Sequence, residues 1–376
     1  MSTVSDEILS RVERVVAVAA AHAEAVDREA RFPRETVDAL REAGLLGLTS
    51  AADVGGLGRG PREAVLVVER LARACGSSAM VTCMHYAGNA VLEKHAAPEV
   101  RREVAAGRHL STLAFSEAGS RSQFWAPTSS ASASAGGKVV LEADKSWITS
   151  ARHATAYVWS SRPVQGEGAS TLWLVPREAA GLSVGPLYTG LGLRGNDSSP
   201  VGARGVELPE SARLGPDGGG LDLMLGTVLP WFNLMNAACS VGLMHAACER
   251  ASAHCSATRH THAGSSLADL PTIRANLARM RIATDMAAAL LRDAVDAVCA
   301  GSSDAMLRVL EVKAGAGEAA LEVTDTAMRV CGGAAYRKEV GVERVFRDAR
   351  AASVMAPTSD HLFDFIGKAM CGLPVF

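Results

Sequence analysis

The fold of this chain is decided by one stretch near its C-terminus, Cys331-Gly332-Gly333-Ala334-Ala335-Tyr336, with Glu339, Arg344 and Arg347-Asp348-Ala349-Arg350 after it. The paired glycines let the backbone approach a bound molecule closely, because no Cβ stands in the way. Long Ala-, Leu- and Met-rich segments flank the stretch at 305–331 and 359–371, and both have helical character. The glycine turn is therefore expected at the end of a buried helix.

Working outward from this stretch, three regions differ in periodicity. Residues 1–110 carry apolar side chains at helical spacing, whereas 111–215 contain alternating, β-branched segments punctuated by Gly, Ser and Pro. Residues 216–376 return to long apolar helices, with a break expected at Pro230. The order helix, sheet, helix predicts an α+β fold, comprising an N-terminal helical domain, a small antiparallel β domain and a C-terminal four-helix bundle.

Composition excludes several classes of protein. The net charge of -2 and the pI near 6.6 give no reason to expect nucleic acid or an anionic membrane as a partner. No uncharged apolar run is long enough to span a bilayer, and Asp6 and Glu7 argue against a secretory signal. The eight cysteines are scattered without a CxxC pair, so we expect free thiols in a reducing cytoplasm and no metal site.

Several motifs together resemble the acyl-CoA dehydrogenase superfamily over nearly the whole chain. The N-terminal region has Arg31-Phe32-Pro33, Gly44-Leu45-Leu46-Gly47-Leu48 and Gly55-Gly56-Leu57-Gly58 in the family's order. The β region has Phe115-Ser116-Glu117-Ala118-Gly119-Ser120-Arg121-Ser122, similar to T-E-P-G-A-G-S, and Lys145-Ser146-Trp147-Ile148-Thr149, similar to K-x-W-I-T. With the glycine stretch, these imply an FAD-dependent oxidoreductase that forms a homo-oligomer, a dimer or the family's usual tetramer.

The resemblance also implies which residues hold the cofactor. In the family, the two β-region segments bond the edge of the isoalloxazine ring, and the Trp lies against it. Hydrogen bonds at that edge raise the electron affinity of the flavin, and an aromatic wall keeps water away. An arginine at the position of Arg259 reaches the pyrophosphate of FAD on a neighbouring subunit. The expected cofactor residues are Phe115, Ser116, Ser122, Trp147, Ile148, Thr149, Arg259, Arg329, Gly332, Gly333, Thr358 and Asp360.

The chain departs from the family at the general base. The Glu that removes the α-proton of an acyl thioester usually follows R-D-A, where this chain has Ala356, and the alternative position is Phe232. A methyl group cannot accept a proton, and general-base catalysis contributes about 10²–10⁴-fold. The family's base residue also donates its backbone N–H to the thioester carbonyl, together with a ribityl hydroxyl of the flavin, and Ala356 keeps that N–H. Candidate replacement bases are Asp360, His361, His85 and Asp197.

Contacts to coenzyme A are altered as well. A D-x-x-R pattern that contacts the pantetheine region in the family corresponds to Pro230-Trp231-Phe232-Asn233, and Arg329 stands where the family has Gln. The stretch Arg259-His260-Thr261-His262-Ala263 has one residue more than the family's R-x-x-F-G. These departures therefore favour a substrate on the phosphopantetheine arm of a carrier protein, or a free small molecule, over one bound to coenzyme A. The residues expected to bind the substrate are Ser122, Phe232, Asn233 and Met355.

Three functions remain open at this point. The first is FAD-dependent oxidation of an acyl thioester on CoA or a carrier protein in a biosynthetic pathway, with electrons passing to an acceptor. The second is a flavin monooxygenase supplied with reduced flavin by a reductase, which needs no α-carbon base and is favoured by His260 and His262. The third is a non-catalytic helical assembly protein. The two segments that resemble flavin-binding motifs, 115–122 and 145–149, argue against it.

Overall fold

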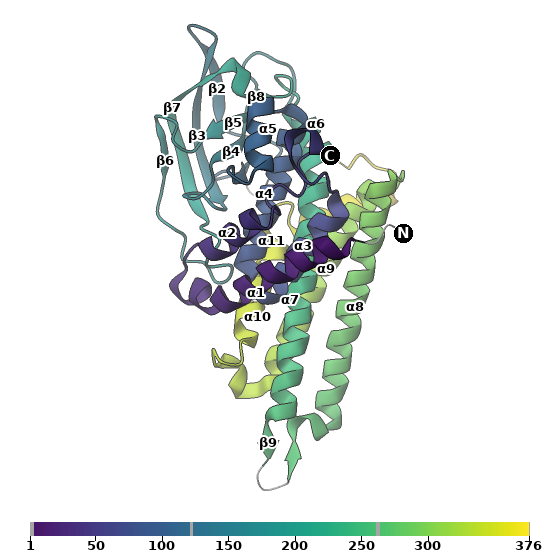
Figure 1. The fold of residues 1–376 in the computed structure, drawn as a ribbon. Helices are drawn as coiled ribbons and strands as arrows, with labels where there is room; N and C mark the ends of the chain where they lie inside the picture. Colours follow the sequence, from purple (N-terminus) through teal and green to yellow (C-terminus); the bar gives the residue numbers. More distant parts are fainter. Residues whose placement is uncertain (1–3, 121–122, 261–263, 376) are drawn as a thin grey trace.

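The computed structural model describes residues 4–120, 123–260 and 264–375, and shows helices before and after a middle β region (Figure 1). The N-terminal helices are α1 (Asp6–Glu29), α2 (Arg34–Glu42), α3 (Pro61–Ala74), α4 (Gly76–His95) and α5 (Pro98–Ala105). Ser5 caps α1, because its hydroxyl accepts a hydrogen bond from the N–H of Ile8 at 3.4 Å. The apolar face of α1 is buried against α3, as its helical spacing predicts.

The middle region consists of two four-stranded sheets with the orders β1-β4-β5-β8 and β2-β3-β7-β6. Its strands are β1 (Ser111–Ala114), β2 (Ser130–Ser134), β3 (Lys138–Ile148), β4 (Ala156–Ser161), β5 (Thr171–Pro176), β6 (Leu182–Val184), β7 (Ser199–Pro209) and β8 (Arg213–Leu214). The pairs are antiparallel except β1 with β4, which are parallel. This pair differs from the prediction because the chain passes through β2 and β3 of the other sheet before it returns as β4.

The C-terminal region is helical, as predicted. Its helices are α6 (Gly220–Leu223), α7 (Leu229–Ala257), α8 (Pro271–Ala300), α9 (Ala305–Cys331), α10 (Val342–Ala349), α11 (Ala351–Val354) and α12 (Ser359–Met370). The helices α7, α8 and α12 all pack on α9, which makes α9 the centre of the bundle. Between α7 and α8 lie β9 (Arg259–His260) and β10 (Ser265–Ser266), at the end of the molecule farthest from the sheets (Figure 1).

The break expected at Pro230 is the start of a helix. A π-helical turn, Met224–Val228, leads into α7, and Pro230 occupies the first turn of α7. Proline is tolerated at this place because the first backbone N–H groups of a helix have no partner within the helix. The π-helical turn and the first residues of α7 lie beside α4, where they help to form the cavity described below.

Helix α4 is the longest of the described helices that periodicity did not predict. Its residues from Gly76 to Cys83 and from His85 to Leu92 are buried, so its sequence has no regularly spaced polar face. The burial follows from its central position, because α4 packs against α3, α7 and β1. The consequence for the site is direct: α4 carries Met80 and Met84 to the junction between the sheets and the bundle.

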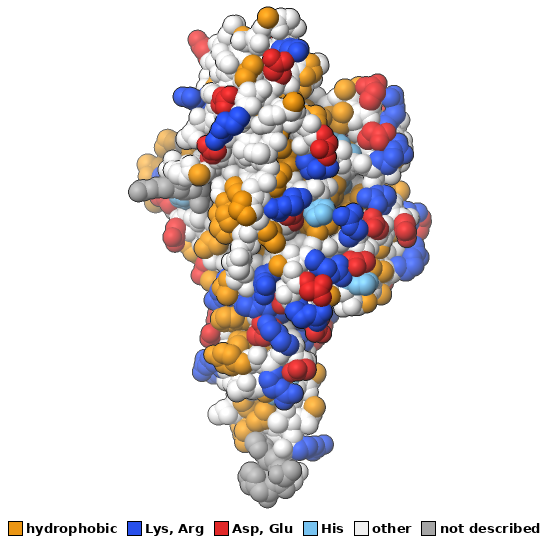
Figure 2. All heavy atoms as spheres, turned by 90° about the vertical axis from the view of Figure 1, so that its left-hand side faces the viewer, with side chains coloured by type: hydrophobic (Ala, Val, Ile, Leu, Met, Phe, Trp, Pro, Cys, Tyr) orange, Lys and Arg blue, Asp and Glu red, His pale blue; other side chains and the backbone are white. Residues whose placement is uncertain are grey.

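The surface shown in Figure 2 has Lys and Arg side chains interspersed with Asp and Glu, so this face carries no patch of a single charge. Within the described ranges, no helix combines the length and the apolar character that crossing a bilayer requires. All eight cysteines are free thiols, and Cys75, Cys83, Cys239, Cys255 and Cys331 are buried.

Candidate functional site

A cavity of about 560 Å³ lies where the β region meets the helices, within the size range of pockets that bind small molecules and cofactors. One wall is formed by the ends of β1 and β3 with the loops that follow them, and by the loop before β7. The other wall is formed by α4, the start of α7 and the α11–α12 connector, residues 355–358. Residues far apart in the sequence, such as Ser116 and Ala356, therefore meet at one cavity.

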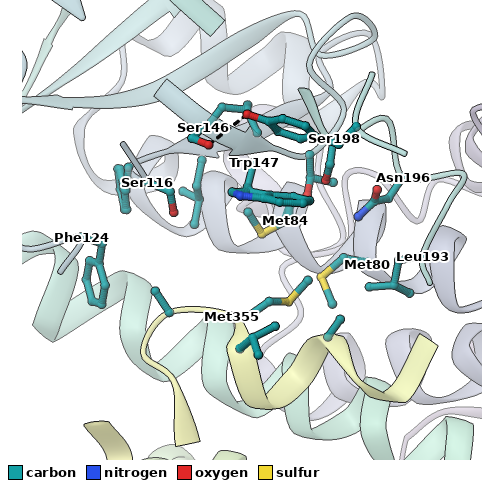
Figure 3. A pocket seen from close by; sticks show the side chains of 18 of the residues that line it. Met80, Met84, Ser116, Phe124, Ser146, Trp147, Leu193, Asn196, Ser198 and Met355 are labelled. Atoms are coloured by element: carbon teal, nitrogen blue, oxygen red, sulfur yellow. Dashed lines mark hydrogen bonds between the residues drawn. The ribbon is translucent and has the colours of Figure 1, made fainter. Parts of the chain in front are cut away.

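Trp147 presents its ring to this cavity (Figure 3). Two residues of β3, Ser146 and Trp147, stand opposite one residue of β7, and this bulge holds Trp147 at φ 58°. One side of the indole stacks on Tyr188 with 4.2 Å between ring centroids, and the Tyr188 hydroxyl lies 3.0 Å from Ser146 Oγ. Because 60 % of Trp147 is exposed, an aromatic surface remains free for a planar ring.

Two hydroxyl groups beside Trp147 are also free. Ser116 and Thr149 line the cavity, and their side chains form no hydrogen bond with the residues that the structure describes. Phe115 and Ile148 lie next to them in the chain and line the same wall. An exposed aromatic face flanked by unpaired hydroxyls suits an isoalloxazine ring, which combines a large flat surface with a polar edge. The residues on this wall therefore fit FAD.

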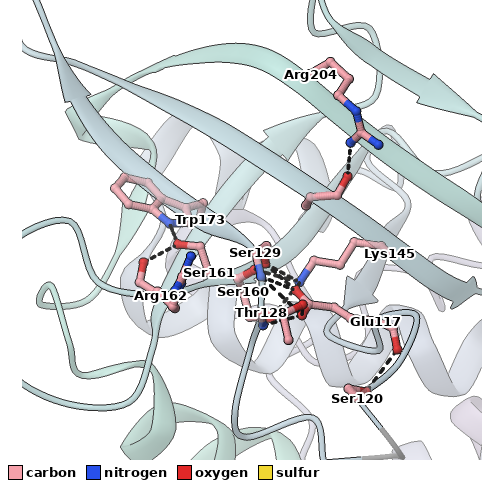
Figure 4. A network of polar contacts seen from close by, with 11 residues as sticks. Glu117, Ser120, Thr128, Ser129, Lys145, Ser160, Ser161, Arg162, Trp173 and Arg204 are labelled. Atoms are coloured by element: carbon pink, nitrogen blue, oxygen red, sulfur yellow. Dashed lines mark hydrogen bonds and ion pairs between the residues drawn. The ribbon is translucent and has the colours of Figure 1, made fainter.

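The carboxylate of Glu117, in the loop that follows β1, is held in a buried ion pair (Figure 4). Its Oε1 lies 2.6 Å from Lys145 Nζ, and its Oε2 accepts hydrogen bonds from the N–H and the hydroxyl of Thr128, each at 2.5 Å. Burial on its own would raise the pKa of Glu117, but the Lys145 ammonium and the hydroxyls of Ser129 and Thr128 lower it to about 2. Glu117 thus anchors the loop and is too acidic to act as a base near neutral pH.

The wall opposite Trp147 is apolar. Met355, Ala356 and Pro357 come from the connector, and Phe232 and Leu229 come from the first turns of α7. Figure 3 shows the thioethers of Met80, Met84 and Met355 on the same side of the Trp147 ring. Ala356 and Phe232, the two positions where the resemblance leads us to expect a base, therefore lie at the cavity, and neither side chain can accept a proton.

Histidine 85 and aspartate 197, two of the candidate bases, are committed to structural bonds. His85 is 0 % exposed: Nδ1 accepts from the N–H of Ser111 at 3.1 Å, so Nε2 donates to the carbonyl of Leu46 at 2.8 Å. Burial lowers the pKa of His85 to about 4, so the ring is neutral with both nitrogens occupied. Asp197 pairs with Arg152 at 2.5 Å and accepts from its backbone N–H at 2.6 Å. Neither residue lines the cavity.

The other two candidates lie on α12, beyond the connector. Asp360 is exposed in the first turn, where a carboxylate suits the positive end of a helix. Thr358 caps the same helix, because its hydroxyl accepts from the N–H of His361 at 3.4 Å and lies 3.3 Å from His361 Nδ1. Neither Asp360, Thr358 nor His361 lines the cavity, so the suggestion that Asp360 replaces the missing base has no support in the geometry.

Several expected cofactor residues are not at the cavity of their own chain. Arg259 on β9, Arg329 at the end of α9 and the Gly332-Gly333 pair after it are all exposed, and none of them lines the cavity. A Cβ at Gly332 or Gly333 would meet nothing within 4 Å, so this turn offers an open backbone surface.

Asn233, one of the residues expected to bind the substrate, is buried and donates to the carbonyl of Val309 at 3.3 Å, so it does not form part of the cavity wall. Ser122 and His262 lie outside the described residues.

The structure adds residues that the motifs did not single out. Met80 and Met84 come from α4, and Arg194 and Asn196 come from the loop before β7. The side chains of Arg194 and Asn196 form no hydrogen bond or ion pair within the described part of the chain. Gly192 and Gly195, on either side of Arg194, have no room for a Cβ, because backbone or side-chain atoms stand within 2.3 Å of where it would be. The signal available in the sequence was the density of glycines in this loop, at Gly190, Gly192 and Gly195.

Comparison with known proteins covers nearly the whole chain. The N-terminal, middle and C-terminal domain models of acyl-CoA dehydrogenase match residues 4–107, 112–206 and 218–371. A probable acyl-CoA dehydrogenase of Bacillus subtilis, YngJ, is 27 % identical over 360 residues, which are 91 % of this chain and 90 % of that protein.

Two solved structures have the same fold. Butyryl-CoA dehydrogenase from Megasphaera elsdenii superposes with a TM-score of 0.91 at 19 % identity, over 99 % of this chain and 100 % of that one. The prolyl acyl carrier protein oxidase AnaB superposes with a TM-score of 0.88 at 18 % identity, over 98 % of this chain and 100 % of that one. At these identities the likeness describes the fold.

Proposed function

Because the chain belongs to the acyl-CoA dehydrogenase family, and is thus a flavin oxidoreductase with FAD as its cofactor, we propose that it oxidises an acyl thioester in a biosynthetic pathway. One observation carries this proposal: the free ring face of Trp147 and the free hydroxyls of Ser116 and Thr149 stand across one cavity from an apolar wall that contains Ala356. The first group suits a flavin, and the second suits an acyl chain.

In this proposal Trp147 supports the isoalloxazine ring, and Ser116 and Thr149 bond its polar edge. FAD supplies a hydride acceptor when it is bound, and the α-proton passes to water, because no described side chain at the cavity is a free base. Met80, Met84, Met355 and Phe232 contact the acyl chain. Met is unbranched and flexible, so these side chains can adapt to more than one acyl shape. The N–H of Ala356 serves as a hydrogen-bond donor toward the thioester carbonyl.

The exposed cofactor residues give a reason to propose an oligomer. Arg259, Arg329 and Gly332-Gly333 lie away from the cavity of their own chain, yet their chemistry suits a pyrophosphate and a nucleotide. We place them on the FAD of a neighbouring subunit in a homodimer or homotetramer. Exposed apolar side chains on α8, Ile282 and Met286, occupy one face of that helix and are available for subunit contacts.

The choice between CoA and a carrier protein turns on charge. Coenzyme A brings several phosphates, whereas a carrier protein presents one phosphate at the end of its arm. Among the described residues at the cavity, Arg194 is the one cation, and Pro230 and Asn233 occupy the places of the family's Asp and Arg. These features favour a carrier-bound thioester over its CoA counterpart.

The test is the visible spectrum of the purified protein under anaerobic conditions. Acyl-pantetheine or acyl-carrier thioesters are expected to bleach the oxidised-flavin bands, and to do so faster than the same acyl groups on CoA. Bleaching by no thioester would contradict the proposal. A pantetheine ester of a fully α-substituted acid, which has no α-hydrogen, is the matched control and should leave the spectrum unchanged.

A second function is favoured by a separate observation. Within the described residues at the cavity, the one carboxylate is Glu117, and Lys145 holds it ionised in an ion pair. A monooxygenase that uses reduced flavin and oxygen needs no base at the α-carbon, so this site would serve it without further change. Substrate consumption that requires both a flavin reductase and oxygen would identify this activity, and anaerobic bleaching by a thioester would exclude it.

A further inference from the structure

A buried lysine lies directly behind the wall that carries Ala356. Lys313 on α9 is 1 % exposed, and its Nζ donates to the carbonyl oxygens of Ala352, Met355 and Pro357 at 3.1, 3.0 and 2.7 Å. No acidic side chain in the described part of the chain pairs with it. An ammonium group has three N–H donors, and these carbonyls use all of them. The contacts therefore hold the segment from α11 to the start of α12 against α9.

The carbonyl of Met355 and the N–H of Ala356 belong to one peptide unit. This bond is trans, so its C=O and N–H point in opposite directions in one plane. Because the Met355 oxygen faces Lys313, the N–H of Ala356 points away from α9. Ala356 lines the cavity, and its N–H forms no hydrogen bond among the described residues. The donor is thus left free on the cavity side.

We propose that Lys313 is a positioning residue: it fixes the Met355–Ala356 peptide so that the Ala356 N–H faces the cavity as the donor for a substrate carbonyl oxygen. The assignment rests on the proposed thioester chemistry for the identity of that oxygen. An ammonium group on the carbonyl side also polarises the peptide, because hydrogen bonds in a chain strengthen one another at low dielectric. Lys313 acts through the peptide and touches no substrate.

The ionisation of Lys313 gives this arrangement a dependence on pH. Burial lowers the pKa of Lys313 to about 7. The titratable group that faces it is the thiol of Cys83, whose pKa burial raises, so the thiol stays neutral over the same range. A neutral amine has two N–H donors instead of three, and the carbonyls of Ala352, Met355 and Pro357 then share fewer partners.

The first measurement is amide hydrogen exchange of the FAD-loaded protein. Lys313→Met replaces the ammonium group with an apolar side chain of similar length, and it is expected to lower protection of residues 351–358 by roughly tenfold. Leu310→Ala is the matched control, because it opens a cavity on the same helix and leaves the ammonium in place. Protection of 351–358 that is equal in Lys313→Met and the wild type would overturn the proposal. If Lys313→Met does not fold, Lys313→Gln takes its place.

The second measurement is the infrared carbonyl stretch of butyryl-pantetheine carrying ¹³C at the thioester carbon. A shift to lower frequency on binding to the wild type, largely lost in Lys313→Met at nearly unchanged affinity, is the expected result. A shift that Lys313→Met retains overturns the positioning role and leaves the proposed function standing. No shift in the wild type contradicts the proposed function instead, and the exchange measurement then decides whether Lys313 holds the connector.

Discussion

Ala356 is half-buried at the cavity, so a longer side chain at this residue can point toward the substrate. At the residue scale we therefore expect Ala356→Glu to accelerate the anaerobic reduction of bound FAD by an acyl-CoA by about 10²–10⁴-fold over Ala356→Gln. The Gln variant has the same shape without a basic carboxylate, which makes it the matched control. Stopped-flow absorbance measures the rate. Equal rates in the two variants would mean that the cavity no longer presents an α-carbon to position 356.

The ion pair between Glu117 and Lys145 is expected to stabilise the folded protein while both side chains are charged. Glu117→Gln leaves a buried ammonium unpaired, so the free energy of unfolding should fall by about 3–5 kcal/mol in urea titrations at pH 7. The double variant Glu117→Gln with Lys145→Met should recover most of this loss. If the double variant is as unstable as the single one, the loss of stability comes mainly from the hydrogen bonds of Glu117 with Thr128 and Ser129, and less from the unpaired ammonium.

The same pair predicts a dependence on acid. Because the folded pKa of Glu117, about 2, lies below its ordinary value of 4.5, its contribution is present above pH 4.5 and is lost as the pH falls from there through about 2. The wild type should therefore lose more stability than Glu117→Gln over this interval, measured by urea unfolding at each pH. Parallel curves for the two proteins would contradict the lowered pKa.

At the element scale, His85 joins α4 to the β region and to the loop that contains Leu46. His85→Leu leaves the Leu46 carbonyl and the Ser111 N–H without partners, each at a cost of about 1–3 kcal/mol. Urea unfolding should therefore show a large loss of stability, while the absorption spectrum of bound FAD and the rate of its reduction at saturating thioester stay close to the wild type. A variant of normal stability that cannot reduce its flavin would instead identify His85 as a base.

Sequence patterns predicted some elements closely and others not at all. The helix expected at 305–331 matches α9, whose buried residues recur at helical spacing, and the strand expected around Thr171–Val175 matches β5, a short apolar run that is buried on both faces. Helix α4 was not predicted, because it is buried on every side and its sequence therefore has no periodic alternation of apolar and polar residues. The motifs singled out Ser116, Trp147 and Ala356, and these three residues line one cavity. They did not single out Arg194, because it lies in a loop whose shape depends on packing against α10 and α1.

At the scale of the whole molecule, the distance between β9 and the sheets is the central feature (Figure 1). If Arg259 serves the cofactor of a neighbour, Arg259→Ala should lower FAD affinity about tenfold or more while the mass in solution stays the same. Arg279→Ala on α8 is the control, because that exposed side chain bonds to the side chain of Asn276. Ultrafiltration of FAD and light scattering measure the two quantities. An unchanged FAD affinity in Arg259→Ala would remove the arginine from the cofactor site.

Trp147 has a positive φ, so the residue that suits the cavity is not the residue that suits the backbone at this position. A bulky residue in this region is strained by about 1–3 kcal/mol, whereas glycine adopts the same angles without penalty. In the protein without FAD, Trp147→Gly should therefore melt at a higher temperature than Trp147→Ala, as calorimetry can show. In a library randomised at residue 147, the two selections should therefore enrich different residues. Selection for survival of heating should enrich glycine, whereas selection of yellow colonies, which retain flavin, should enrich tryptophan.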